Sequence, residues 1–329
     1  MSRALIIGGT RFIGRHLVTE LLDSGYEITL FNRGNHPNPF AETEGVSHVT
    51  GDRTSGAALD EAAQTVEPDI VIDCVAYYPG EVELATKAFR DVDAYVFISS
   101  GSAYGPDHIP KREDETPLEP CTDEQAVDDS PASYGPRKAE GDRKVFEAAE
   151  HGVRAMSVRP TIVYGTHDYT GRLHYWVERV RNHDEILIPG DGTNIHHLVA
   201  VENVASALRV VAEAGEAGEA YNVGDRSVLT LETLVKTIAD VLDRDVDLVT
   251  AGPRELAEHA TGGLEPTDFP LYNPNPHILS TAKLAELGWE PVAPQTALKT
   301  AAGWEGPPER DPGPSREETE RVLAKLNRN

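Results

Sequence analysis

The chain has 329 residues, and its 55 Asp and Glu against 30 Lys and Arg give a formal net charge of −25. Such a chain lacks the basic stripe that displaces counterions from phosphates, which argues against nucleic acid or an anionic membrane as a partner. Two cysteines are too few for a disulfide framework or a cysteine metal cluster. The length suits one large or two moderate domains with a sizeable core.

The sequence also bears on the compartment. No basic start with an apolar middle precedes the first apolar run, and no apolar run approaches the roughly 18 residues of a membrane helix. Cys74 lies within an apolar run and Cys121 within an acidic loop. We therefore expect a soluble, cytoplasmic protein whose two thiols stay reduced.

The first half of the chain alternates short apolar runs with helical patterns. Strands are predicted at residues 4–7, 26–31, 46–50, 69–75 and 94–98, and helices at 57–66 and 81–90. Nearly continuous apolar strands that alternate with helices are typical of a parallel sheet covered on both faces. The predicted fold class is α/β with a doubly wound parallel sheet, and ligands of such sheets bind at the carboxyl ends of the strands.

The second half is less regular. Residues 106–131 are rich in Pro, Asp and Glu and predict a surface loop, after which a helix is expected at 133–150 and a strand at 153–158. Beyond residue 165 helices and short strands alternate irregularly. The helices are expected near 173–180, 201–212, 230–242, 281–287 and 295–302, and the strands near 185–188, 195–199, 220–223 and 246–249. This pattern predicts a smaller mixed α/β domain, partly interleaved with the sheet.

The opening strand runs directly into the turn Gly8-Gly9-Thr10-Arg11-Phe12-Ile13-Gly14, and apolar residues then recur at helical spacing until Gly25. A strand, a glycine turn and a helix N-terminus bring backbone N–H groups together with the positive end of a helix dipole. The natural guest is a phosphate, most often a dinucleotide pyrophosphate. The alternative is a turn whose glycines serve only for bending.

Tyr134 and Lys138 lie four residues apart at the start of a predicted helix and hence on one face. An adjacent ammonium group stabilises a phenolate, so the tyrosine can exchange protons nearer neutral pH. Such pairs are also common in helices without any catalytic function. Here, however, the pair follows the serine-rich end of the fifth strand, residues 99–105, in a chain that opens with a dinucleotide-type turn.

Together these features resemble the extended short-chain dehydrogenase/reductase family, also called the NAD-dependent epimerase/dehydratase family, in an atypical branch whose first turn reads Gly-Gly-Thr-Arg-Phe-Ile-Gly. The resemblance spans nearly the whole chain. Beyond the glycine turn, it rests on Ser100, Tyr104-Gly105, Tyr134 with Lys138, Arg159-Pro160, Val163-Tyr164-Gly165, Gly190-Asp191-Gly192 and Leu287-Gly288-Trp289.

The resemblance implies a Rossmann sheet with a smaller substrate domain. We accordingly expect a dinucleotide-binding domain over residues 1–165 and a substrate domain over 166–305, from which parts of 190–225 return to the first domain. A linker with a terminal helix is expected over 306–329. Family members often pair through two helices of each subunit, so a homodimer is expected.

The resemblance also implies hydride transfer between a nicotinamide and a carbinol carbon. Tyr134 would be the acid/base, Lys138 would lower its pKa and bind the nicotinamide ribose, and Ser100 would hydrogen-bond the reacting oxygen. Asp52 would contact the adenine. The cofactor-binding residues predicted in this way are Gly8, Thr10, Arg11, Phe12, Ile13, Gly14, Asn32, Arg33, Asp52, Arg53, Ala76, Lys138 and Pro160. The predicted substrate residues are Ser102, Tyr104 and His196.

Two departures from the family pattern concern the cofactor. Arg11 replaces the usual middle glycine of the first turn, and Asn32, followed by Arg33, stands where an acid usually holds a ribose 2′-hydroxyl. Loss of a carboxylate and gain of guanidinium groups favour a 2′-phosphate, so NADP is predicted in preference to NAD. The alternative is that Arg11 and Arg33 are ordinary surface residues.

Other departures concern the substrate. Gly101 and Ser102 follow Ser100 where dehydratases carry an Asp-Glu pair, which argues against dehydration. Ile162 and His196 stand where nucleotide-sugar epimerases usually have an Asn and an Arg that hold the diphosphate. A diphosphate site is thereby weakened, although His196, His197 or Arg172 could supply donors.

We therefore expect an enzyme that acts on a sugar or nucleotide sugar by transient oxidation, as epimerases do. The first alternative is an NADP-dependent reductase or dehydrogenase of a smaller carbonyl or sugar. The second is a non-catalytic RNA-binding protein, because the first turn also resembles the chloroplast stem-loop-binding branch of the family. The intact Ser100, Tyr134 and Lys138 and the acidic charge both argue against RNA binding.

Five residues of types that often bind metal ions lie in the second half of the chain: His167, Asp168, His174, His196 and His197. Their spacing matches no known metal site, and the family chemistry requires no metal. No metal cofactor is therefore expected.

The acidic excess predicts a halophilic protein, because the Debye length falls to about 3 Å near 1 M salt and mutual repulsion of carboxylates is then screened. We expect the midpoint of thermal unfolding to rise steadily as KCl is added, up to about 1 M or beyond. Circular dichroism measured across that series is the test. Full stability at low salt would contradict the prediction.

Overall fold

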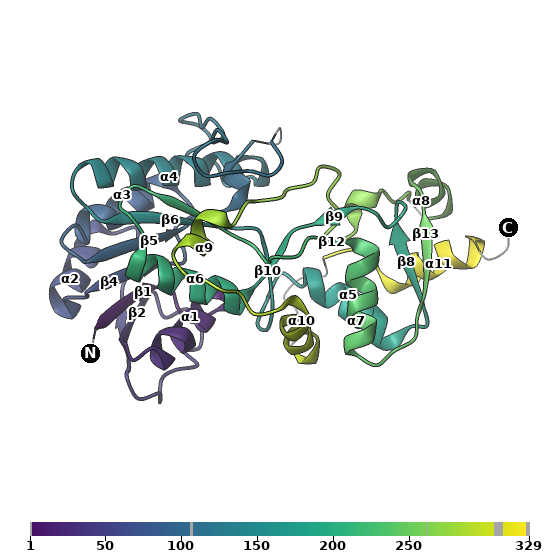
Figure 1. Cartoon of the computed structure of the whole chain (residues 1–329), viewed down its shortest axis with the longest axis horizontal. Coiled ribbons are helices and arrows are strands. Elements are labelled where there is room, and N and C mark those ends of the chain that lie inside the picture. Colours follow the sequence, from purple (N-terminus) through teal and green to yellow (C-terminus); the bar gives the residue numbers. More distant parts are fainter. Residues whose placement is uncertain (1, 106–107, 261, 306–311, 327–329) are drawn as a thin grey trace. The chain divides into compact units, whose positions relative to one another are not determined.

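The structure is a computed structural model that describes residues 2–105, 108–260, 262–305 and 312–326. It divides the chain into two compact units, each built from three segments (Figure 1). The first unit comprises Met1–Val163, Val201–Gly224 and Leu279–Pro291, and the second comprises Tyr164–Ala200, Asp225–Ile278 and Val292–Asn329. Residues 306–311 of the expected linker lie outside the described residues.

A parallel sheet of seven strands forms the centre of the first unit, in the order β11-β6-β5-β4-β1-β2-β3. Its strands are β1 (Arg3–Ile7), β2 (Glu27–Asn32), β3 (Val46–Thr50), β4 (Ile70–Asp73), β5 (Ala94–Ile98), β6 (Ala155–Pro160) and β11 (Ala220–Val223). Every residue of β4, β5 and β6 is buried, which explains why these strands read as continuous apolar runs. The predicted fold class is confirmed.

Helices cover both faces of this sheet (Figure 1). On one face α1 (Phe12–Asp23) packs against α6 (Val201–Ala214). On the other, α3 (Pro79–Ala88) packs between α2 (Gly56–Val66) and α4 (Tyr134–Glu150). The central strands β4, β5 and β6 are thereby shielded from water on both sides, as their apolar residues require.

Strand β1 marks the point where the order of the strands reverses. From β1 the chain builds β2 and β3 on one side and then crosses to β4, β5 and β6 on the other. The connection that follows β1 therefore runs to one side of the sheet, and the connection that follows β4 runs to the other. Doubly wound sheets bind their ligands in the crevice between two such connections, at the carboxyl ends of the strands.

The second unit is a smaller mixed α/β structure. Strand β8 (Glu185–Pro189) pairs in parallel with β13 (Asp247–Ala251), and β9 (Ile195–His196) pairs antiparallel with β12 (Leu229–Thr230). Its helices are α5 (Arg172–Asn182), α7 (Leu231–Val241), α8 (Pro253–His259), α10 (Pro294–Gly303) and α11 (Arg316–Leu326). No described helix of either unit combines the length and the hydropathy needed to cross a membrane.

Short elements lie where the chain passes between the units. Strands β7 (Ile162–Tyr164) and β10 (Leu198–Ala200) occupy two such passages. A third segment, Leu279–Pro291, returns to the first unit with the short helix α9 (Ala282–Glu286), which contacts β11. The sequence pattern predicts this helix but places it in the substrate domain.

A buried ion pair fastens α4 to the sheet. Arg159 of β6 donates from Nε to Asp142 Oδ2 of α4 at 2.8 Å, and the two side chains are 1% and 0% exposed. Arg159 Nη1 also donates to the hydroxyl of Tyr104 at 2.6 Å, and that hydroxyl donates to Asn222 Oδ1 of β11 at 2.8 Å. One polar network therefore connects α4 with two neighbouring strands.

Replacing Asp142 should show how much α4 depends on this network. In Asp142→Ala the Arg159 guanidinium stays buried without a carboxylate, so we expect a loss of about 3–5 kcal/mol in the free energy of unfolding. Glu140→Ala on the same helix is the matched control. It removes a solvent-accessible ion pair with Arg143 and should cost less than about 1 kcal/mol. Similar losses for the two variants in urea unfolding would contradict the prediction.

Candidate active site

The glycine turn after β1 brings α1 unusually close to the end of the strand. Gly8 and Gly9 have φ values of +112° and +92°, which residues with a side chain rarely adopt. A Cβ on Gly14 would lie 2.8 Å from the backbone nitrogen of Gly9, so only glycine permits this contact between helix and turn. Arg11 caps α1 without a side-chain hydrogen bond to the helix. The turn thus aims the N-terminus of α1 at the crevice.

Asn32 at the end of β2 is held by hydrogen bonds on both sides of its amide. Its Nδ2 donates to the Gly8 carbonyl at 3.1 Å, and its Oδ1 accepts from the backbone nitrogen of Gly34 at 2.9 Å. The first bond requires a donor at this position, which an ionised aspartate lacks. Asn32 therefore stabilises the first turn, whereas Arg33 beside it is exposed.

Asp52 and Arg53 follow β3, yet their side chains lie in opposite environments. Asp52 is exposed, and hydrogen bonds from Thr54, with smaller contributions from Arg33 and Arg53, lower the pKa of its carboxyl. Arg53 is 8% exposed and its Nη1 donates to both oxygens of Asp73 at 2.5 and 2.7 Å. Its Nη2 donates to the Glu81 carbonyl at 2.8 Å. The guanidinium of Arg53 thus links the ends of β3 and β4 to α3.

Lys138 is the buried cation of the site. Its Nζ donates to the carbonyls of Ala76, beyond β4, and of Ile98, in β5, each at 2.8 Å. Burial lowers the pKa of Lys138 to about 8, while Asp73 and Asp142 oppose this shift. Nζ also lies 5.9 Å from the centre of the Tyr134 ring. An ammonium group has three donors, so the two carbonyls leave one for a ligand.

Tyr134 is the first residue of α4, and a close backbone contact sets the position of that helix end. A Cβ on Gly135 would lie 2.4 Å from the carbonyl oxygen of Ser102, so the glycine lets α4 approach the turn after β5. Within that turn Ser100 Oγ accepts from the backbone nitrogen of Ser102 at 3.1 Å. Ser100 and Tyr134 are partly exposed and Ser102 is exposed.

The other two predicted substrate residues are buried. Tyr104 is 3% exposed, its hydroxyl belongs to the Arg159 network, and burial raises its pKa to about 12. His196 belongs to the second unit and is 2% exposed, and burial lowers its pKa to about 4. Its imidazole is therefore uncharged at neutral pH and cannot replace the positive charge of an arginine. His197 of the same unit is also buried, within 2.8 Å of the Asp225 carbonyl.

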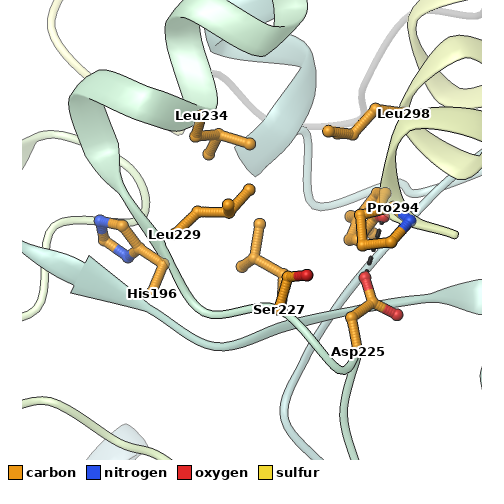
Figure 2. Close-up of a pocket in the computed structure, with 9 residues that line it drawn as sticks. His196, Asp225, Ser227, Leu229, Leu234, Pro294 and Leu298 are labelled. Atoms are coloured by element: carbon orange, nitrogen blue, oxygen red, sulfur yellow. Dashed lines mark hydrogen bonds between the residues drawn. The ribbon is translucent and has the colours of Figure 1, made fainter.

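Figure 2 shows a pocket within the second unit. Its cavity volume is about 10 Å³, which is room for about one water molecule. Asp225 at its edge accepts from the hydroxyl of Tyr164 at 3.0 Å. The remaining lining residues are His196, Leu198, Ser227, Leu229, Leu234, Pro294 and Leu298. A sugar does not fit in this space, so the pocket is not by itself a sugar site.

The residues of the first unit fit a nicotinamide dinucleotide. The glycines keep the first turn close to the N-terminus of α1, where backbone N–H groups can receive a pyrophosphate, and the Lys138 ammonium is held at the carboxyl ends of β4 and β5. The remaining predicted cofactor residues belong to the same unit: Thr10 and Ile13 are partly buried, and Phe12, Ala76 and Pro160 are buried.

Several residues that shape the site were not predicted. Asp73 and Asp142 pair with buried arginines, and Tyr95 donates from its hydroxyl to Asp73 at 3.0 Å. Asp73 could have been noticed, since a carboxylate in an apolar strand requires a cationic or hydrogen-bonding partner. Among the described residues, no three His, Cys, Asp or Glu side chains are arranged to hold a metal ion.

Relatives of the chain include both enzymes and a protein named for binding RNA stem-loops. A chloroplast stem-loop binding protein of 41 kDa from Arabidopsis thaliana is 28% identical over 72% of this chain, and the match spans less than two thirds of that relative, 62%. A dTDP-glucose 4,6-dehydratase of Xanthomonas campestris is 26% identical over 89% of both chains.

Solved structures share the fold at low sequence identity. The dTDP-glucose 4,6-dehydratase of Bacillus anthracis in complex with NAD has a TM-score of 0.71 at 21% identity, covering 92% of this chain and 96% of that one. The UDP-glucose 4-epimerase of Thermotoga maritima, with UDP-glucose, has a TM-score of 0.72 at 21% identity, covering 92% and 98%.

The family assignment rests on a family model that matches more than half of the chain. Residues 4–224 match the NAD dependent epimerase/dehydratase family, and they include the glycine turn, the serine turn after β5 and the start of α4. This confirms the resemblance drawn from the motifs. The chain belongs to the NAD dependent epimerase/dehydratase family, and it is thus an enzyme of the extended short-chain dehydrogenase/reductase type.

Proposed function

We propose that the chain transfers a hydride to or from a carbon of a sugar or nucleotide sugar, with Ser100, Tyr134 and Lys138 as the catalytic residues. The observation that carries the proposal is the Lys138 ammonium, which the Ala76 and Ile98 carbonyls fix at the carboxyl ends of β4 and β5 and which belongs to the same helix as Tyr134. Burial of an ammonium group costs free energy, so a buried lysine at this position is unusual. Its third N–H donor can bind a ribose hydroxyl of the cofactor.

The chemistry follows from these three side chains. The nicotinamide cofactor, when bound, accepts a hydride from the substrate carbon or returns it. The Tyr134 phenolate accepts the hydroxyl proton of the substrate as that carbon becomes a carbonyl, and Lys138 favours the phenolate by its positive charge. Ser100 donates its hydroxyl to the reacting oxygen. Reduction is the reverse, with Tyr134 returning the proton.

We propose NADP as the preferred cofactor. Asn32 has its amide nitrogen on the Gly8 carbonyl and provides no carboxylate for a ribose 2′-hydroxyl, while Arg33 is exposed beside it. A guanidinium next to an uncharged side chain favours a 2′-phosphate. Asp52 remains the proposed adenine contact. Arg53 is proposed to support the cofactor site by holding the ends of β3 and β4 together.

Two alternative functions remain, a reductase of a smaller carbonyl compound and an RNA-binding protein. An uncharged, buried His196 and the dehydratase residues missing after Ser100 favour a reductase of a smaller carbonyl compound over an enzyme that grips a diphosphate. The similarity to the chloroplast stem-loop binding protein suggests RNA binding, which the net charge of −25 disfavours.

The proposal includes a homodimer in the cytoplasm, on grounds of family likeness. Cys74 and Cys121 are both free thiols, which agrees with a reducing compartment. Adaptation to concentrated salt is part of the same proposal.

Nucleotide carried by the purified protein distinguishes an epimerase from a reductase. We expect the protein to bind NADPH more tightly than NADH, and a reductase with an exchangeable cofactor would in addition release no stoichiometric nucleotide on denaturation. Mass spectrometry of the released fraction and calorimetry with both nucleotides are the measurements. Stoichiometric NAD(H) would favour an epimerase, and tighter NADH binding would refute the NADP preference.

Tyr134→Phe and the pH profile test the catalytic roles. The variant should lose turnover by a factor of about 10² or more while its nucleotide affinity stays within twofold of wild type. Turnover should fall as pH rises through about 8, since Lys138 loses its proton there. Lys138→Arg keeps its charge and should move this fall to higher pH, whereas Lys144→Arg, on the exposed side of α4, should not. Turnover that survives in Tyr134→Phe would overturn the assignment.

A further inference from the structure

A histidine that the sequence motifs do not single out lies beside the end of β2. His48 of β3 is exposed, and its Nε2 is 3.1 Å from Asn32 Oδ1. Strands β2 and β3 are parallel neighbours in which His48 is aligned with Leu30, so the side chains of Leu30, Asn32 and His48 share one face of the sheet. On this face Leu30 touches the first turn, because a Cβ on Gly9 would meet its Cδ2.

The hydrogen bonds of Asn32 settle the roles of the imidazole. Asn32 Nδ2 donates to the Gly8 carbonyl, so Oδ1 is the acceptor, and it already accepts from Gly34. His48 Nε2 must then carry a proton and donate. The same count leaves Asn32 Oδ1 with two donors and no free lone pair for a ribose 2′-hydroxyl. The exposed side chains of His48 and Arg33 are polar groups at this edge that can still bind a ligand.

We propose that His48 and Arg33 together bind a phosphate monoester on the adenosine ribose, which is the 2′-phosphate of NADP. The inference rests on the NADP preference proposed above and adds a residue and a geometry to it. An imidazole anchored through Nε2 still has Nδ1 for a second hydrogen bond, and a phosphate accepts hydrogen bonds from imidazole and guanidinium N–H groups. Asn32 then acts as the positioning residue for His48.

Binding of two small nucleotides tests this site without any turnover. Adenosine 2′,5′-bisphosphate and 5′-AMP differ only by the 2′-phosphate, and their dissociation constants are measured by calorimetry at one fixed KCl concentration. Wild type should bind the bisphosphate at least about tenfold more tightly. His48→Ala should weaken the bisphosphate by about fivefold to tenfold and leave 5′-AMP unchanged.

Further variants separate a direct contact from an effect through Asn32. His48→Gln retains an amide donor for Asn32 but cannot become cationic, so it should weaken the bisphosphate like His48→Ala. His48→Arg should keep the preference. His151→Ala is the matched control, because this exposed histidine caps the C-terminus of α4 and its Nδ1 is hydrogen-bonded to the Glu147 carbonyl. Thermal unfolding of each variant in the same buffer shows that it is folded.

The outcomes distinguish this inference from the proposal on which it rests. A wild-type protein that binds both nucleotides equally would refute the NADP preference and the site with it. A wild type that prefers the bisphosphate, together with an unchanged His48→Ala, would overturn the role of His48 alone. Equal weakening of both nucleotides in His48→Ala would show that His48 acts through the first turn, and it would also overturn the contact.

Discussion

A buried ammonium group held by two strand-end carbonyls is the constraint on which the first unit depends. Lys138 is 4% exposed, and its bonds to Ala76 and Ile98 fix α4 against β4 and β5. Burying that charge is costly, and the carboxylates of Asp73 and Asp142 offset part of the cost. Each carboxylate is in turn paired with a buried arginine. The cation of the candidate site is thus supported by two buried ion pairs of the protein interior.

Two buried arginines hold together the strands and helices that carry the candidate site. Arg53 joins the ends of β3 and β4 to α3, and Arg159 joins β6 and β11 to α4. Both networks lie within the sheet unit, so the residues that face the crevice are set by the packing of strands and helices rather than by loops. Such support holds Tyr134 and Lys138, near the start of α4, in one geometry.

Much of the first unit could be predicted because its central strands are buried on both faces and its turn requires glycine. The sequence could not show that Arg53 and Tyr104 point inward, since an arginine after a strand and a tyrosine in a turn suit solvent equally well. Asp73 could have been noticed as a carboxylate in an apolar strand, but its partner Arg53 is distant in sequence, and so is Asn32 from His48. The return of Leu279–Pro291 to the first unit was missed, because the apolar pattern of a five-residue helix does not indicate which strand or helix it packs against.

The three-segment construction of the first unit has a consequence for synthesis on the ribosome. Six strands of the sheet are complete by residue 160, but the seventh, β11, and the helix α6 that packs beside α1 come from residues 201–223. Until those residues emerge, β6 is an open edge and one face of the sheet lacks half its cover. A nascent chain arrested in this interval exposes both features that lead to aggregation, so prompt translation of the intervening second-unit segment protects the fold.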